Sequence, residues 1–291
     1  MTLVETAAKA TAAPSRAAFR PPPAATLVAG LALALIGVAF LWPGLIAPHS
    51  PDVADPVNAL LPPGGGHLFG TDQLGRDTFS RVIYGTRPSL TIGIGATALA
   101  ALAGSLLGVL ALAGGRVLDE AIMRVTDVFL AFPGLLLALL VVAVLGPGTT
   151  NATLALAASA TPGFVRLARA QALVVRRSDY VRAAVILGRP RAAIVLRHIL
   201  PNALPPLLVL ALVNVGTAII AGSSLSFLGL GPQAPTPEWG AMLSDGRDFL
   251  STAWHLAVFP GLAVTVTVFA INIVGRSLQV RFEGRTPGAG L

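Results

Sequence analysis

The sequence predicts an all-α integral membrane protein with six transmembrane helices. Of its 291 residues, 54% are apolar and only 11% are charged, and the mean hydropathy is +0.78. A soluble globular protein carries about a quarter charged residues, so this composition is typical of a chain that lies within a lipid bilayer. Long windows without charged side chains also recur along the chain, and each is long enough for one or two membrane spans.

The first transmembrane helix is predicted at residues 24–46, inside a window from 21 to 48 that has no ionisable group. Its apolar part, 24–42, is long enough to cross a bilayer core, which takes about 20 residues. Trp-Pro follows it rather than a small-residue cleavage site, so we interpret it as an uncleaved span and not as a signal peptide. Residues 1–23 before it are predicted to be a disordered cytoplasmic tail.

Four further windows predict the other five spans. The window from 128 to 165 is interrupted by Gly-Pro-Gly-Thr-Thr-Asn, and Gly with Pro breaks a helix, so two spans flank a short turn there. Arg166 and Arg169 close the second of these early, and their side chains can extend to the membrane interface. The span after the turn is predicted at about 152–170, and the remaining spans are predicted at 88–115, about 203–227 and about 256–275.

Arginine and lysine in the loops predict the orientation of the spans. With the N-terminus inside, the cytoplasmic segments contain 16 of the 20 basic residues and six of the 13 acids. The exceptions among the basic residues are Arg76, Arg81, Arg87 and Arg247. This asymmetry accounts for the net charge of +7, so a nucleic-acid partner is not needed to explain it. Both termini, including the tail 284–291, are predicted to be cytoplasmic.

Several kinds of chemistry are excluded by what the chain lacks. There is no cysteine, and the single lysine, Lys9, is followed by alanine in the N-terminal tail, whereas a P-loop needs a lysine directly after glycine. The chain is therefore predicted not to hydrolyse ATP and to have no catalytic residue. The four histidines are scattered over four segments without helical ligand spacing, so no metal site is predicted; they are His49, His67, His198 and His255.

Two loops differ from ordinary connections. The outside loop, 47–87, is rich in Pro and Gly, and its composition alone indicates a solvated connector. The inside loop holds eight Arg and one acid between 166 and 201. Its apolar spacing predicts two short amphipathic helices hinged at Gly188, and the small pair Ala183-Ala184 would let a partner approach closely. On the residues alone, a helix lying on anionic lipid and a dock for a protein remain equal alternatives.

Three stretches together resemble the permease subunits of bacterial ABC importers of the oligopeptide/dipeptide/nickel group. They are GTDQLGRDTFSRVIYGTRPSL at 70–90, an EAA-type loop at about 176–202, and LSFLGLGPQAPTPEWGAML at 225–243 with FPGL at 259–262. In the loop, Ala183, Ala184, Gly188, Leu200 and Pro201 match that family's pattern, while Arg182 replaces its Glu and His198 its Ile. Arg276 also follows the last span where the group often has Asp.

The resemblance implies a type I ABC importer permease fold with a cytoplasmic coupling helix and a core at 88–283, in a bacterial inner membrane. It implies a homologous permease subunit, two cytoplasmic ATPase subunits and an external solute-binding protein as partners, with no cofactor on this chain and with ATP and Mg²⁺ used by the ATPases. The residues that would couple to the ATPases are Tyr180, Arg182, Ala183, Ala184, Gly188, His198, Leu200 and Pro201. Those that would face the binding protein are Asp72, Gly75, Arg76, Asp77, Glu238 and Trp239.

The resemblance favours import of dipeptides or oligopeptides, driven by ATP on the partner subunits. A nickel-chelate importer is the alternative within the family. From other classes, a membrane scaffold stays open, and a secondary transporter or channel is disfavoured because the first, second, fifth and sixth spans contain no acidic or basic residue, which a proton relay would need.

Overall fold

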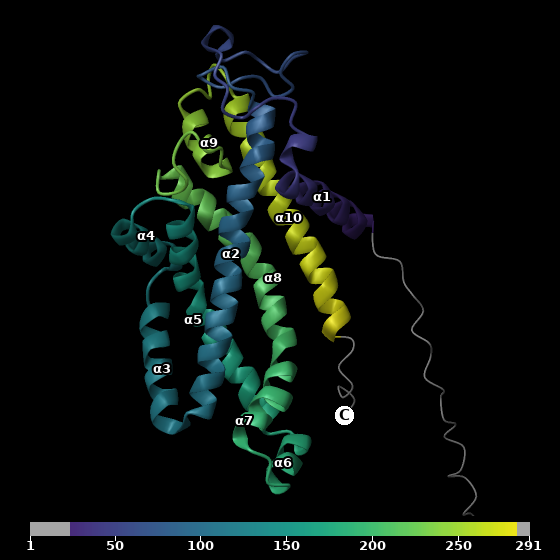
Figure 1. The fold of residues 1–291 in the computed structure, drawn as a ribbon, viewed down its shortest axis with the longest axis vertical. Coiled ribbons are helices and arrows are strands. Elements are labelled where there is room, and N and C mark those ends of the chain that lie inside the picture. The colour runs from purple at the N-terminus through teal and green to yellow at the C-terminus, as the bar shows by residue number, and fades with distance from the viewer. Residues whose placement is uncertain (1–23, 284–291) are drawn as a thin grey trace, which may run out of the picture.

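The computed structural model describes residues 24–283, and the predicted tails 1–23 and 284–291 lie outside the described residues. Within that range every helix-or-strand element is a helix, and the only β-type pairing is an isolated bridge between Thr71 and Asp77. Figure 1 shows an elongated bundle with irregular loops and helix α9 (Trp239–Arg247) at one end and two short helices, α6 and α7, at the other. The predicted all-α class is confirmed.

Helix α1 (Ala24–Leu41) confirms the first predicted span apart from its last residues, since Pro43–Leu45 forms a separate 3-10 turn. Only Ala29 and Ala39 are buried in it, whereas four of its five leucines are exposed. An apolar helix whose surface is mostly exposed in the isolated chain needs lipid or another apolar surface around it.

Helix α2 (Thr78–Ala113) corrects the boundary of the outside loop. It begins ten residues before the predicted span at 88, because the Asp77 side chain accepts a hydrogen bond from the Ser80 amide and caps its N-terminus. Pro88 lies inside the helix without ending it. Small residues let α2 pack closely: a Cβ added at Gly104 would overlap Phe164, and one at Gly93 would overlap Ile219.

The prediction that the third span is one helix, preceded by an inside loop, is wrong. The structure has two helices, α3 (Gly115–Leu130) and α4 (Gly134–Leu145), which meet at an angle of 94°. Pro133 at the break has no backbone N–H to donate and disfavours the helical conformation of the residue before it, which favours a break at this position. The pair is either a broken span or a re-entrant segment. The segment predicted as an inside loop, 114–127, is therefore mostly helical.

Three long helices complete the bundle: α5 (Thr149–Arg176), α8 (Leu200–Phe227) and α10 (His255–Glu283). In the described part of the chain, four helical stretches are long and apolar enough to cross a membrane, or five if the α3–α4 pair counts as one span. Helix α5 is not among them, so the count of six stays a prediction. The multi-pass membrane character does not depend on that count.

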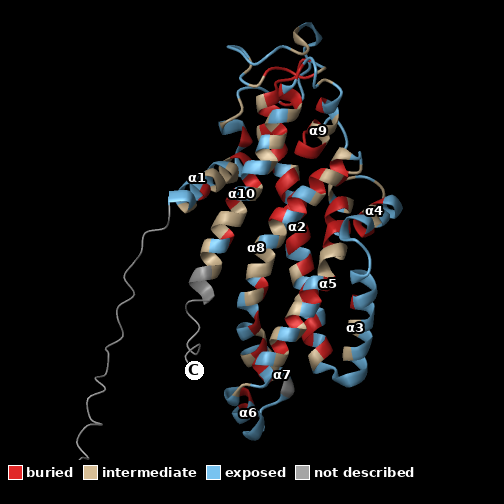
Figure 2. Cartoon of the chain, turned by 180° about the vertical axis from the view of Figure 1, so that it is seen from behind, coloured by how far each residue is buried: buried red, intermediate tan, exposed pale blue. Residues whose placement is uncertain are grey.

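The core lies between α2, α5 and α8. One apolar cluster includes Ile92, Val142, Leu156 and Leu225, and a second is built around Phe164, Ala168 and Leu207. Figure 2 shows buried residues on the inward sides of these helices and in the end that contains α9, while the outward sides are largely exposed. The bundle therefore presents apolar outer surfaces and holds its most buried polar groups at the α9 end.

Candidate functional site

Two regions at opposite ends of the bundle contain the residues to which sequence analysis assigned roles. We call residues 176–202 the hairpin and residues 42–77 with 228–254 the cap. The hairpin contains α6 (Asp179–Ile186), α7 (Arg191–Ile194) and a π-helical stretch (Val195–Ile199) that runs directly into α8. The cap contains the loops after α1 and α8 together with α9.

The turn of the hairpin is a specific helix ending. Gly188 has a φ of +72°, its amide donates to the carbonyl of Val185, and the amide of Arg189 donates to the carbonyl of Ala184. These two bonds form a Schellman motif, in which glycine takes the left-handed position because other residues are strained there. Helix α7 begins directly after Pro190. The predicted pair of short helices hinged at Gly188 is confirmed.

One face of the hairpin packs against the bundle. Val181 and Ala184 are buried in an apolar cluster with Ala172 and Val175 of α5 and with Ile199. This cluster holds α6 against the end of α5. Ala184 therefore serves the hairpin's own packing, and the expectation that Ala183 and Ala184 both face a partner is corrected: only Ala183 is exposed.

The opposite face of the hairpin is apolar and exposed. Ile186 and Leu187 at its tip are 85% and 78% exposed, and Val185 next to them and Tyr180 in the first turn of α6 are also exposed. Exposed, adjacent, large apolar side chains at the end of a fixed element mark a surface that binds something apolar. Arg182 lies on the same helix; its side chain is 67% exposed and lies 3.7 Å from Asp179.

The other residues assigned to coupling lie at the base of the hairpin. The His198 ring stands 6.3 Å from the Tyr180 ring, and its Nε2 is buried without a hydrogen-bond partner. Leu200 is half-buried and Pro201 is exposed in the first turn of α8. The structure thus brings His198 next to Tyr180, and it places Leu200 and Pro201 at the start of α8 rather than in α6.

The cap buries all six residues that were predicted to face a binding protein, so none of them is accessible to one in this structure. Asp72 accepts a 2.6 Å bond from Arg76 Nε, lies 3.5 Å from Arg81 Nε, and accepts from two backbone amides of its own turn. Arg81 also donates to the carbonyl of Pro51 at 2.9 Å. Gly75 is buried with a φ of +74° where it meets the Asp55 backbone. These groups hold the cap loops together.

Glu238 and Trp239 join α9 to α2. The Glu238 carboxylate is 1% exposed; it accepts from Ser89 Oγ of α2 at 2.9 Å and from the Ala241 amide at 2.9 Å, capping α9. The Trp239 indole N–H donates to the carbonyl of Val82 at 2.9 Å. Ser89 was not singled out from the sequence, because only the fold brings it to a residue 149 positions away.

Asp77 is also held inside the cap by hydrogen bonds, which affect its pKa. Burial by itself would raise the pKa of its carboxyl, but hydrogen bonds from the Ser80 hydroxyl and amide and from His67 outweigh burial and lower the pKa below its ordinary value. The carboxylate is thus held in its charged form, which favours its place at the N-terminus of α2. The same contact brings two of the four scattered histidines, His49 and His67, to one carboxylate.

Comparison with known proteins identifies relatives over most of the chain. A family described as binding-protein-dependent transport system inner membrane component matches residues 64–287. The probable D,D-dipeptide transport system permease protein DdpC of Escherichia coli (strain K12) is 41% identical over 90% of this chain and 88% of its own length. The dipeptide transport system permease protein DppC of Alkalihalophilus pseudofirmus is 44% identical over 77% and 74%. The glutathione transport system permease protein GsiD of Pectobacterium atrosepticum is 42% identical over 87% and 84%.

Proposed function

The chain belongs to the family of binding-protein-dependent transport system inner membrane components, and from this premise we propose that it is the permease subunit of an ATP-driven peptide importer. Proteins of this family are non-catalytic membrane components of ABC transporters, so the chain is a multi-pass membrane subunit and not itself an enzyme. Relatives named for dipeptide, D,D-dipeptide and glutathione transport support a peptide cargo over a nickel chelate.

The observation that carries the proposal is the exposed apolar tip of the hairpin. A permease without a P-loop lysine can use ATP only through contact with a protein that binds it. Ile186 and Leu187 offer an apolar anchor for a cleft of such an ATPase, and Tyr180 and Arg182 border it. In this proposal two ATPase subunits hold ATP and Mg²⁺, and this chain binds no cofactor.

The packing of the hairpin supports its role as a coupling element. Val181 and Ala184 fix α6 to the end of α5, and the helical chain from Val195 continues without interruption into α8. A displacement of α6 by an ATPase would therefore act on two long helices together, as rigid packed elements move in other conformational switches. One of them, α8, packs against α2 in the core of the bundle.

The proposed orientation places the hairpin in the cytoplasm, with both termini, and the cap outside. The Arg-rich sequence around the hairpin supports this placement. The solute-binding protein would then dock on exposed cap side chains such as Val57 and Leu68, which are accessible where the six buried residues are not. A homologous permease subunit would cover the exposed apolar sides of the bundle and complete the translocation pathway between the two chains.

The test is to express the chain with its proposed partners, purify the complex in mild detergent, and measure ATP hydrolysis with the solute-binding protein and peptides. We expect ATPase subunits to co-purify and peptide-loaded binding protein to stimulate hydrolysis. A nickel chelate in place of peptide is the matched control and should give no stimulation. Purification of the chain without any ATPase, under conditions that keep it folded, would contradict the proposal and favour transport that does not use ATP.

A further inference from the structure

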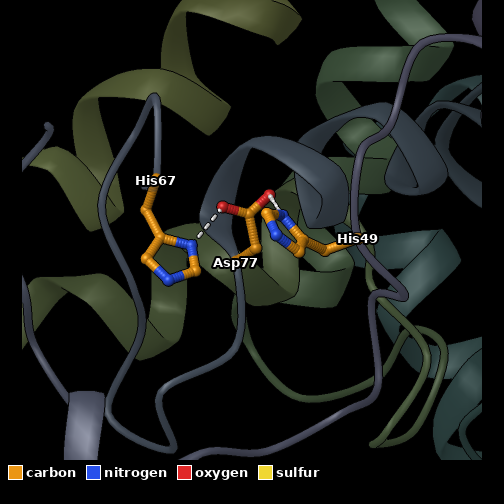
Figure 3. Close-up of side chains that lie close together, drawn as sticks. All are labelled: His49, His67 and Asp77. Atoms are coloured by element: carbon orange, nitrogen blue, oxygen red, sulfur yellow. Dashed lines mark hydrogen bonds and ion pairs between the residues drawn. The ribbon is translucent and has the colours of Figure 1, made fainter. Parts of the chain in front are cut away.

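The cap holds a group of side chains that the proposed transport function does not use. His49 lies in the link after α1, His67 in the loop that follows, and Asp77 at the N-terminus of α2 (Figure 3). Nδ1 of His67 lies 2.8 Å from Oδ1 of Asp77, and Nδ1 of His49 lies 3.7 Å from Oδ2. The two imidazole rings stand 5.2 Å apart, centroid to centroid.

We propose that His49, His67 and Asp77 form a binding site for a divalent transition-metal ion. One ligand atom from each residue lies within 4.8 Å of the other two. Ligand atoms about 2.0–2.2 Å from a tetrahedral Zn²⁺ are roughly 3.3–3.6 Å from one another. The 2.8 Å separation of His67 Nδ1 from Oδ1 is shorter than this range, and the 3.7 Å separation of His49 Nδ1 from Oδ2 is slightly longer. Rotation of the imidazoles about their side-chain bonds would be needed to bring one atom of each residue to coordinating distance.

The carboxylate is already fixed for this role. Oδ2 of Asp77 accepts from the Ser80 amide at 2.8 Å and from Ser80 Oγ at 2.6 Å. The same Ser80 hydroxyl accepts from the backbone amide of His49 at 3.1 Å, which holds one histidine close to the carboxylate. Hydrogen bonds of this kind orient the ligands of metal sites and raise their affinity. Oδ1 remains on the side that faces His67.

The donor set indicates which ions fit. Two imidazole nitrogens and one carboxylate oxygen suit Zn²⁺, Ni²⁺ or Cu²⁺, whereas Mg²⁺ and Ca²⁺ prefer oxygen ligands throughout. Exposure of the side chains rises from 2% at Asp77 through 23% at His67 to 48% at His49. The site is therefore closed on the protein side and open toward solvent, which leaves an entry path and room for a water ligand.

A bound ion would join the link after α1 to the N-terminus of α2 and the loop that carries His67. These segments meet at the end of the molecule opposite the hairpin. An ion that binds only the folded chain stabilises it in proportion to the logarithm of its concentration. The site would thus stiffen the cap when a transition metal is present, independently of which solute the transporter moves.

The experiment uses the full chain, purified in detergent with a tag that contains no histidine and stripped with EDTA. Zn²⁺ alone is titrated and followed by calorimetry and by competition with a chromogenic chelator. We expect one equivalent of Zn²⁺ to bind per chain. His49→Ala, which keeps the backbone bond to Ser80, and Asp77→Asn, which keeps a helix-capping side chain, should each weaken binding at least about tenfold.

His198→Ala is the matched control, because it removes a histidine at the opposite end of the molecule and should bind Zn²⁺ as the wild-type chain does. Thermal unfolding with and without Zn²⁺ is the second measurement, and the ion should raise Tm of the wild-type and His198→Ala chains but not of His49→Ala. Each chain is first compared in EDTA, so that loss of folding is separated from loss of binding. Equal Zn²⁺ affinity in wild-type and His49→Ala chains, or no binding by the folded wild-type chain, would show that Asp77 and the histidines form only a hydrogen-bonded helix cap.

Discussion

The hairpin and the cap use charged and apolar residues in opposite ways. In the cap, Asp72, Arg76 and Glu238 are buried; Asp72 and Arg76 pair with each other, and Glu238 accepts from the Ser89 hydroxyl. In the hairpin, Arg182 is solvated while Ile186 and Leu187 are exposed. Burying a charge is costly unless it is paired and hydrogen-bonded, so the cap's polar residues are structural. Exposed apolar side chains gain free energy when they are removed from water, so we propose that the hairpin's tip is the surface that binds a partner.

The largest expected effect comes from making the hairpin tip polar. Replacing Ile186 and Leu187 together with Asp should abolish co-purification of the ATPase subunits, because two charges would have to enter an apolar cleft. The chain should still insert and fold, since both side chains are exposed. Pull-down of the ATPases checks this, with Ile186→Leu as the control that should bind normally. Unchanged association would mean that the tip is not the docking surface.

The second largest effect is expected from a substitution at the hinge residue, Gly188. Gly188→Val forces a branched side chain into a φ of +72°, which costs about 1–3 kcal/mol and favours another turn. No neighbouring atom lies within 4 Å of a Cβ added there, so only the backbone opposes the change. We expect peptide uptake to be abolished while membrane insertion stays intact. Gly188→Asn, which tolerates the left-handed conformation, should retain most uptake in the same vesicle assay; equal loss in both variants would refute the conformational reason.

In the cap, the corresponding change affects stability rather than docking. Glu238→Ala leaves the Ser89 hydroxyl and the Ala241 amide without their acceptor, at a cost of about 1–3 kcal/mol for each group that stays unsatisfied. Thermal unfolding of the purified chain should show a lower Tm, and Glu238→Gln, whose single amide oxygen can replace one of the two acceptors, should recover part of it. Should Glu238→Ala keep its Tm but lose binding-protein stimulation, the cap residue would face the partner after all.

The smallest effect is expected at Arg182. Its pairing with Asp179 at 3.7 Å is solvent-exposed, and such pairs contribute little to stability. Arg182→Ala should leave Tm unchanged and lower ATPase affinity only modestly, measured by titrating the ATPase subunits onto the permease. Comparison at low and high salt separates a charge contribution, which salt screens, from loss of packing. An effect as large as that of the tip variant would make charge, and not apolar contact, the basis of docking.

The sequence predicted the hairpin in more detail than the cap. Its elements are local: the apolar spacing around Tyr180, the glycine at 188 and the proline at 190 lie within a few residues of the contacts they make. The cap depends on pairs such as Ser89 with Glu238, which no spacing rule connects. The same reason explains why His49 and His67 looked scattered along the chain and yet share one carboxylate.

By itself the sequence determined that the chain is an all-α, multi-pass membrane protein, that it lacks a P-loop, and that it resembles the family to which it belongs. Composition, charge-free windows and short motifs can be seen in the sequence alone. A long apolar segment in a bilayer must satisfy its own backbone hydrogen bonds, so it forms a helix. Only the tertiary structure decided which residues of each motif are exposed to solvent and which are buried. Packing buried the charges of the cap and left Ile186 and Leu187 in solvent, because burial depends on neighbours that are distant in sequence.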